Sequence, residues 1–384
     1  MKIMLVTVDY PPPMGGIQIV TRNLEEDLQA AGHEVYILNF DGRNTNNFKK
    51  LRLSDLFYTE ATRNDYYKLE NLLNPTKLLV PSGYRDFVYS NLIFRETNQA
   101  RESFRPDLTH ILKPTLDSAI YSCKEPVIVS CHGEELQSAF PVSYCLHKAS
   151  LIHCVSNYSK GLVKRLRPDA INIEVIHNSV DLHGMESIEL GRKEPMIVSC
   201  CRLVKRKNID SLLKAFALLP KQIINTYRFV IIGEGPEKAN LVKLANNLGL
   251  YSTRFVGQIS DEEKRKLLSR SKLFVLCPRP YQSDFEGNEE GFGISYIEAQ
   301  AAGVPIVGSN IGGIPEAVGN AGVLVQDPTD PEEIASCIGQ LLIDQDLYES
   351  YQKNALSRVK NFDRKLLFQQ FLRLYQKVLN DGHE

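Results

Sequence analysis

Short runs of apolar and β-branched residues alternate with helical patterns along most of the chain. Near-continuous apolar runs are typical of parallel strands buried on both faces of a sheet. The first series covers residues 3–8, 35–38, 108–112, 127–130, 151–155 and 173–176, and the second covers residues 196–199, 229–232, 254–256, 273–276, 305–307 and 323–325. Two successive series of this kind predict an α/β protein with two doubly wound parallel sheets.

The stretch between the two series has the composition of a linker. It is polar and charged, carries Gly191 and ends in Pro195, which favours an irregular connection. Near the C-terminus, apolar residues recur at a spacing close to the helical period. We therefore expect an N-terminal domain at residues 1–184, a linker at 185–194, a C-terminal domain at 195–362, and a terminal helix at 363–384 that returns to the N-terminal domain.

Composition agrees with two soluble domains and names no partner. The chain has 384 residues, and its 45 Lys and Arg nearly cancel its 46 Asp and Glu, so no overall charge attracts nucleic acid. The eight cysteines form no C-x-x-C pair, which disfavours a zinc site or a disulfide framework. The first apolar run is too short for a signal-peptide core. We expect a cytoplasmic protein, with peripheral contact to a membrane surface left open.

Two glycines follow the first predicted strand. Gly15 and Gly16 precede a helical pattern that begins near Val20. Glycines at such a turn let backbone amides at a helix N-terminus approach an anion. A tight turn that only needs positive φ explains the same two residues equally well.

A basic cluster follows the first strand of the second series. Arg202, Lys205, Arg206 and Lys207 lie within six residues of one another. Arginine offers a planar fork and lysine a point charge, so such a cluster is suited to a diphosphate. The alternative is a solvated helix start, but cations packed this densely repel one another unless an anion is present.

Two glutamates flank a glycine-rich turn in the second half of the chain. Glu290 precedes Gly291-Phe292-Gly293, and Glu298 lies eight residues further on. On one continuous helix that spacing is about 12 Å, whereas the carboxylate pair of a retaining glycosidase lies about 5 Å apart. The two side chains are therefore expected to contact different parts of one elongated ligand, with Glu298 about two turns into a helix. Two exposed surface glutamates are the alternative, which the apolar flanks disfavour.

Other turns carry weaker signals. His132 follows a predicted strand, but a lone histidine there is more simply a capping or core residue. The turn Gly233-Glu234-Gly235-Pro236 lacks the full dinucleotide fingerprint. The sequence has no G-x-S-x-G motif and no histidine pair with metal-ligand spacing.

Taken in order, these segments resemble the retaining glycosyltransferases of family four, which have the GT-B architecture. The motifs that carry the resemblance are Gly15-Gly16, His132-Gly133, residues 155–160, residues 176–181, Arg202 with Lys207, residues 233–236, and residues 290–298 followed by Gly312-Gly313. Residues 9–18 and 277–302 most resemble mannosyltransferases that act on phosphatidylinositol mannoside. The chain departs from the family pattern at Ser179, Cys201 and Asn208, where glycine is common.

The resemblance implies two Rossmann-like domains facing each other across a deep cleft, and a nucleotide-sugar donor that is a substrate, with no cofactor and no metal. It implies that Gly16, Arg202 and Lys207 hold the diphosphate, that Glu298 holds the ribose, and that Glu290 holds the transferred sugar. The implied catalytic residues are His132, Arg202, Lys207 and Glu290. The implied donor-binding residues are Gly15, Gly16, Arg202, Lys207, Val256, Gly257, Ile259, Glu290, Gly291, Phe292, Gly293, Ile294 and Glu298.

The implied activity is transfer of a hexose with retention of anomeric configuration. GDP-mannose is the first-ranked donor, followed by UDP-glucose and UDP-N-acetylglucosamine, and the acceptor is a lipid, a glycan or a small molecule. Two other classes remain open: a sugar-nucleotide epimerase of the same fold and a non-catalytic nucleotide-sugar-binding protein. Phosphorylases of related architecture are much longer and carry a pyridoxal-bound lysine.

Overall fold

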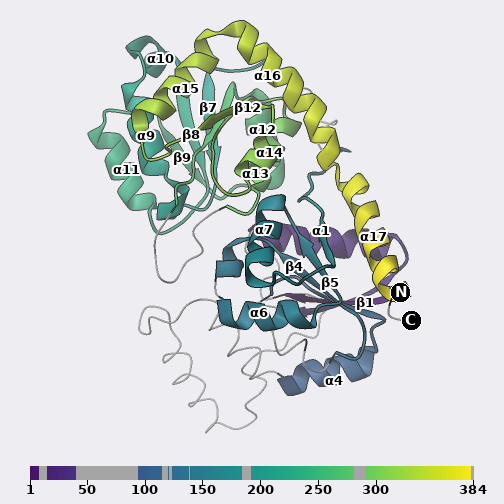
Figure 1. Ribbon diagram of the computed structural model, residues 1–384. Helices are drawn as coiled ribbons and strands as arrows, with labels where there is room; N and C mark the ends of the chain where they lie inside the picture. Colours follow the sequence, from purple (N-terminus) through teal and green to yellow (C-terminus); the bar gives the residue numbers. More distant parts are fainter. Residues whose placement is uncertain are drawn as a thin grey trace, which may run out of the picture. The chain divides into compact units, whose positions relative to one another are not determined.

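The protein divides into two compact units. The computed structural model describes residues 1–7, 15–39, 94–114, 120, 123–137, 139–183, 192–280 and 290–381. Of these, the residues up to His177 and those from Phe368 onward form the first unit, and those from Asn178 to Leu367 form the second. Each unit is built around one six-stranded sheet (Figure 1).

The first sheet contains the first predicted series of strands. Its strands run parallel to one another in the order β2-β1-β3-β4-β5-β6. They span β1 Lys2–Thr7, β2 Glu34–Asn39, β3 Leu108–Ile111, β4 Val127–Cys131, β5 Leu151–Cys154 and β6 Ile173–Val175. All residues of β3, β4 and β5 are buried, as the continuous apolar runs predict.

The second sheet has the strand order of a dinucleotide-binding fold. Its parallel strands lie in the order β12-β11-β10-β7-β8-β9. They span β7 Met196–Cys200, β8 Arg228–Ile232, β9 Arg254–Gly257, β10 Leu273–Leu276, β11 Ile306–Ser309 and β12 Gly322–Val325. The order reverses between β7 and β10, and ligands of such sheets bind beyond the carboxyl ends of the strands at this switch point. The prediction of two doubly wound parallel sheets is confirmed.

Helices connect the strands of both sheets. Figure 1 shows α9 and α11 on one side of the second sheet and α12, α13 and α14 on the other. In the first unit the helices are α1 Gly16–Ala30, α4 Phe94–Phe104, α6 Ala139–Lys148 and α7 Asn157–Leu166. In the second they are α9 Ile209–Leu218, α10 Lys221–Thr226, α11 Lys238–Asn247, α12 Asp261–Arg270, α13 Ile294–Ala301, α14 Ile314–Val318, α15 Pro331–Ile343 and α16 Gln345–Arg358. Short 3-10 turns lie at Glu134–Gln137, Lys205–Lys207 and Val359–Phe362.

The terminal helix α17 Arg364–Asp381 contributes residues to both units. Next to its start, backbone hydrogen bonds join two segments that both belong to the second unit. The Val180 amide donates to Phe362 O at 2.9 Å, and the Arg364 amide donates to Val180 O at 3.0 Å. The apolar positions Phe371, Leu374 and Val378 are buried, which agrees with the helical period in the sequence.

A chain of buried hydrogen bonds joins α17 to the first sheet. Ile176 O can only accept, so the Nε2–H of His153 donates to it at 2.8 Å. The His153 Nδ1 then accepts from the Ser130 hydroxyl at 2.7 Å. The same oxygen accepts from His110 Nε2–H at 2.7 Å, and His110 Nδ1 accepts from the Tyr375 hydroxyl at 2.8 Å. Every side-chain donor in this series of four hydrogen bonds therefore has an acceptor.

This assignment requires both histidines to be neutral. Burial lowers the pKa of His153 to about 3, although its bond to Ile176 O acts in the opposite direction. Burial also lowers the pKa of His110 well below its usual value, and the neighbouring His153 and His132 add to that effect. At neutral pH the two imidazoles are therefore uncharged. The series of hydrogen bonds then holds α17 against the first sheet.

We expect Tyr375→Phe to destabilise the protein by about 1–3 kcal/mol, because the change leaves the buried His110 Nδ1 without a donor. For a unit of this size that is a decrease in melting temperature of about 2–4 °C per kcal/mol. Thermal unfolding followed by circular dichroism measures it. The matched control is Tyr251→Phe, at a side chain that is 77% exposed. A Tyr375→Phe protein that melts with the wild type would contradict the assigned chain.

Candidate functional site

The basic cluster forms a compact turn at the carboxyl end of β7. The chain leaves Cys200, makes a 3-10 turn over Lys205–Lys207 and enters α9 through Asn208. Asn208 has φ 60°, in the left-handed region that glycine and asparagine tolerate best. Its side-chain amide donates to Cys277 O at 2.9 Å and to Pro328 O at 2.6 Å. The asparagine therefore adopts a backbone conformation that glycine also tolerates.

The glycine turn after β8 packs against the backbone of this basic turn. A Cβ at Gly233, which has φ 130°, would lie 1.9 Å from Cys201 O, and a Cβ at Gly235 would lie 2.3 Å from Leu203 O. The Leu203 amide also donates to Glu234 O at 2.8 Å. These glycines allow two backbone segments to approach closely, so the turn positions Arg202 and the residues after it.

Glu290 lies against two cations of the basic turn. One of its oxygens, Oε2, accepts from Arg206 Nη1 at 3.2 Å and also from Lys207 Nζ. The three side chains are largely buried, with 17% of the Glu290 side chain exposed, 7% of Arg206 and 11% of Lys207. The two cations share one carboxylate oxygen, although they precede Glu290 by 84 and 83 positions in the sequence.

The two cations keep Glu290 ionised. Burial by itself raises the pKa of a carboxyl group, but the charges and hydrogen bonds of Lys207 and Arg206 outweigh it and lower the Glu290 pKa to about 2. This value lies below the usual 4.5, so the ion pairs stabilise the fold at neutral pH. That contribution is lost as the pH falls from 4.5 through 2.

The glycines around Glu290 hold its backbone in place. Gly293 has φ 97°, and a Cβ there would lie 2.5 Å from the Tyr296 ring. The Gly313 amide donates to Glu290 O at 2.8 Å, and a Cβ at Gly313 would lie 2.0 Å from Gly291 O. The Tyr296 hydroxyl donates to Leu276 O at the end of β10 at 2.8 Å. These contacts link the turn at residues 291–293 to the switch point of the sheet.

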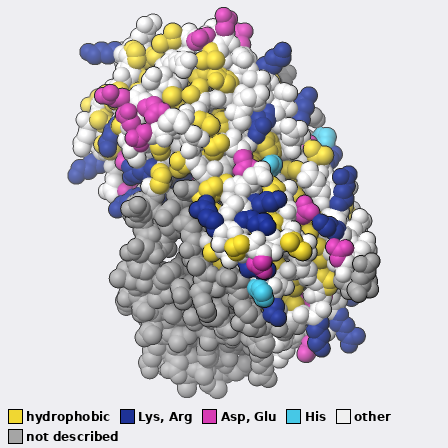
Figure 2. Space-filling model, in the orientation of Figure 1, with side chains coloured by type: hydrophobic (Ala, Val, Ile, Leu, Met, Phe, Trp, Pro, Cys, Tyr) yellow, Lys and Arg dark blue, Asp and Glu magenta, His cyan; other side chains and the backbone are white. Residues whose placement is uncertain are grey.

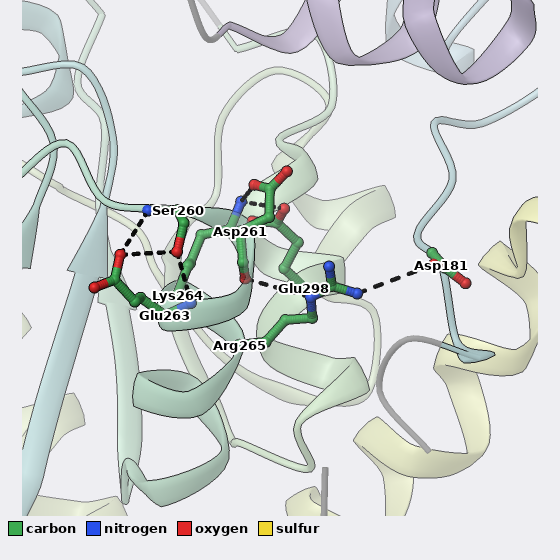
Figure 3. Close-up of polar contacts among 7 residues, drawn as sticks. All are labelled: Asp181, Ser260, Asp261, Glu263, Lys264, Arg265 and Glu298. Carbon is green, nitrogen blue, oxygen red and sulfur yellow. Dashed lines mark hydrogen bonds and ion pairs between the residues drawn. The ribbon is translucent and has the colours of Figure 1, made fainter. Parts of the chain in front are cut away.

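Glu298 pairs with a lysine of another helix. Its Oε1 lies 2.6 Å from Lys264 Nζ, and the same ammonium lies 3.2 Å from Asp261 Oδ1 (Figure 3). One position expected from the sequence is wrong: α13 begins at Ile294, so Glu298 lies little more than one turn into the helix. The left-handed Gly293 delays the helix start. In the structure Glu290 and Glu298 have different cationic partners.

The remaining predicted donor residues of the second unit lie at strand ends and helix starts. Arg202 is exposed in the turn after β7. Val256 is exposed on β9, Gly257 is buried with φ 75°, and Ile259 is half-buried in the connection to α12. Phe292 is buried beside Phe362, and Ile294 is the first residue of α13.

His132 lies in the first unit, directly after β4. Its Nε2 lies 3.1 Å from Leu112 O, and a carbonyl can only accept, so Nε2 carries the proton and Nδ1 remains an acceptor. Burial lowers the His132 pKa to about 4, against the raising effect of the bond to Leu112 O. The Glu135 carboxylate accepts from the amides of His132 and Gly133 and orders the turn. His132 is therefore neutral at neutral pH.

Gly15 and Gly16 begin α1 in the first unit. Gly15 is the N-cap with extended backbone, φ −160°, and its side-chain position offers no capping hydrogen bond. A Cβ at Gly15 would meet the flexible end of Gln18 at 2.3 Å. Because the backbone here is extended, positive φ does not explain Gly15. The structure places both glycines at the start of a 15-residue helix, whose first-turn amides have no partner within the helix.

Two residues of the site were missed by sequence reasoning. In the sequence Arg206 is one cation of a cluster, and only the structure shows that it contacts Glu290 directly. Lys264 lies in a highly charged helix, α12, where the sequence does not distinguish it from the neighbouring charged residues. The spacing Ser260 to Glu263 marks the start of α12 as a capping box, but no local signal shows that the next residue reaches Glu298.

The described part of the chain contains no group of three or more His, Cys, Asp or Glu side chains arranged to hold a metal ion. It also contains no helix long and apolar enough to cross a membrane. All eight cysteines are free thiols, and burial raises the pKa of Cys200 and of Cys201 to about 12, so neither is a thiolate at neutral pH. In Figure 2 acidic and basic side chains are interspersed over the described surface.

Comparisons with known proteins show the family of the chain. Residues 14–183 match the model of Glycosyltransferase Family 4, and residues 185–358 match the model of Glycosyl transferases group 1. A GDP-mannose-dependent alpha-(1-6)-phosphatidylinositol monomannoside mannosyltransferase of Mycobacterium tuberculosis is 26% identical over 366 residues, covering 90% of each chain.

Solved structures show the same fold. A sucrose-phosphate synthase from Thermosynechococcus elongatus superposes with a TM-score of 0.76 at 20% identity, covering 99% of each chain. The Anabaena protein Alr3699/HepE in complex with UDP-glucose has a TM-score of 0.71 at 18% identity, covering 98% of this chain and 100% of that one. With the two family models matching successive halves, the chain belongs to the family-four, group 1 glycosyltransferases with the GT-B fold.

Proposed function

We propose that the protein transfers a hexose from a nucleotide-diphosphate donor to a hydroxyl of an acceptor, with retention at the anomeric carbon and without a metal ion. The observation that carries the proposal is the Arg206–Glu290–Lys207 cluster at the switch point of the second sheet. It combines cations suited to a diphosphate with an ionised carboxylate suited to sugar hydroxyls.

The cluster suggests how the leaving group is stabilised. As the bond from the anomeric carbon to the phosphate oxygen breaks, negative charge grows on the diphosphate. Fixed cations therefore bind the diphosphate more strongly in the transition state than in the ground state. Lys207 and the exposed Arg202 are the residues we assign to this role, with the first-turn amides of α1. Since Lys207 also pairs with Glu290, the second cation, Arg206, keeps that carboxylate compensated while Lys207 contacts phosphate.

Retention follows if the acceptor attacks the face from which the diphosphate leaves. The acceptor oxygen bonds to the anomeric carbon, and its proton passes to the departing phosphate oxygen. Glu290 holds hydroxyls of the transferred sugar and forms no covalent intermediate. We assign the neutral His132 to the same sugar, where its Nδ1 accepts a hydrogen bond from a sugar hydroxyl.

GDP-mannose is our first-ranked donor, and UDP-glucose and UDP-N-acetylglucosamine follow. The ranking is supported by the mycobacterial relative, which is named as GDP-mannose-dependent. The Anabaena structure with UDP-glucose is the reason to keep uridine donors. A sugar-nucleotide epimerase is the competing function, and product analysis with and without an acceptor separates the two, because an epimerase changes the sugar nucleotide with no acceptor present.

We expect Lys207→Ala to weaken the binding of GDP or UDP and of their sugar conjugates alike, by on the order of tenfold to a hundredfold, because a charge-assisted contact to phosphate is lost. Isothermal titration calorimetry measures the change. The control is Lys214→Ala, which removes an exposed lysine of the next helix, α9. Unchanged affinity in Lys207→Ala would contradict the phosphate assignment.

Glu290→Gln is expected to act on the sugar alone. The amide keeps the shape of the side chain but loses its charge, so sugar conjugates lose on the order of tenfold in affinity while the bare nucleoside diphosphate binds as well as before or better. The same titrations with GDP, GDP-mannose, UDP and UDP-glucose report both effects. An equal loss for diphosphates and conjugates would remove Glu290 from the sugar site.

Transfer is expected to survive excess chelator, because protein cations take the place of a divalent ion at the diphosphate. The measurement is donor consumption in the presence of EDTA, then after added magnesium or manganese. Activity that disappears with EDTA and returns with either metal would refute metal independence.

Calorimetric titration of the wild type also decides the donor. A ligand present at about 100 times its dissociation constant raises the free energy of unfolding by roughly 2.7 kcal/mol, so a thermal-shift screen finds the nucleotide first. We expect GDP and GDP-mannose to bind. Tight UDP binding without measurable GDP binding would overturn the ranking and leave the transferase assignment intact.

A further inference from the structure

Lys264 on α12 contacts Glu298 on α13, the glutamate that the family resemblance links to the donor's ribose. Its ammonium lies 2.6 Å from Glu298 Oε1 on α13 and 3.2 Å from Asp261 Oδ1 on its own helix. Only 12% of the Lys264 side chain and 18% of the Glu298 side chain is exposed. A contact this well covered is screened by water far less than a surface ion pair.

A capping box orders the start of α12, the helix that carries Lys264. The Ser260 hydroxyl accepts from the Glu263 amide, and the Glu263 carboxylate accepts from the Ser260 amide (Figure 3). On the same helix, Arg265 Nη1 lies 3.9 Å from Asp181 Oδ2. The capping box fixes the first turn of the helix, and Lys264 immediately follows it.

Charge holds the pair together. Burial by itself lowers the pKa of a lysine, but the Glu298 carboxylate beside it outweighs that effect and raises the Lys264 pKa above its usual value. The ammonium is therefore charged at neutral pH. Its hydrogen bond to Glu298 Oε1 uses one of its three N–H donors, and Asp261 Oδ1 lies within ion-pair distance.

The geometry leaves Glu298 able to accept further hydrogen bonds. An ionised carboxylate has about four acceptor positions on two oxygens, and Lys264 takes one of them on Oε1. The two hydroxyls of a ribose need two more. A carboxylate anchored on one side by a lysine is thus preoriented, and preorientation raises affinity by reducing the ordering that binding requires.

We propose that Lys264 is a positioning residue for the donor's ribose: it orients Glu298 so that Glu298 can accept the 2′- and 3′-hydroxyls. The inference rests on the proposed function, because it needs a nucleotide at this site. Without the ammonium, the neighbouring carboxylates of Glu298 and Asp261 lose the cation that they share. Their repulsion turns Glu298 away from its bound orientation, and this change weakens its bonds to hydroxyls.

The test compares ribose recognition in matched variants. GDP and 2′,3′-dideoxy-GDP, with UDP and 2′,3′-dideoxy-UDP as the second pair, are titrated by calorimetry into the full chain. The variants are Lys264→Met, Lys264→Arg and, as the control, Lys266→Met. Lys266 lies on the same helix and pairs with Glu262, with 58% and 70% of the two side chains exposed, so its loss leaves the site unchanged.

In the wild type, two hydrogen bonds to a charged acceptor make the ribonucleotide bind on the order of tenfold to a hundredfold better than the dideoxy form. We expect Lys264→Met to bring this ratio close to one, through weaker ribonucleotide binding with little change for the dideoxy form. Lys264→Arg retains most of the ratio, and Lys266→Met retains all of it. A general loss of structure would weaken both nucleotides together, and melting curves of each variant check the fold.

The outcomes separate this inference from the proposed function. If the wild type binds neither GDP nor UDP, the proposed function fails and the inference fails with it. If the wild type discriminates against the dideoxy form and Lys264→Met does so equally, Lys264 does not position Glu298. Tighter ribonucleotide binding in Lys264→Met would show that the lysine competes with the ribose, which also overturns the proposal.

Discussion

One carboxylate shared by two buried cations organises the second unit. Glu290 follows β10, whereas Arg206 and Lys207 follow β7, so the ion pairs join the two strands between which the order of the sheet reverses. Removing one partner of such a cluster leaves a buried charge without compensation, which costs far more than an exposed pair contributes. The same arrangement concentrates both signs of charge where a parallel sheet binds its ligands.

Backbone contacts bring these charges together. Gly233 and Gly235 let the turn after β8 lie against the backbone that carries the basic cluster, and Gly313 packs on Gly291 beside Glu290. Each of these contacts is too close for a Cβ, so the glycines determine how far one loop can approach another. The charged side chains are then long enough to meet.

The first unit uses polar groups in its core to hold the terminal helix. The chain from Tyr375 through His110, Ser130 and His153 ends at the Ile176 carbonyl, one residue before the unit boundary. A buried network is favourable only when every member is satisfied, and the tautomers of the two histidines achieve that without any charge. Packing of apolar residues alone would bind α17 without fixing its position along the sheet.

Local sequence patterns are sufficient to predict the two parallel sheets, because runs buried on both faces leave an apolar pattern at every strand. They also predict Glu290 and Lys207 as site residues, since glycines and cations directly after strands are local signals. The Arg206 contact and the Lys264–Glu298 pair depend instead on how the chain folds. Their partners lie 84 and 34 residues away, and which side chains meet depends on strand order and loop approach, which a linear pattern does not record.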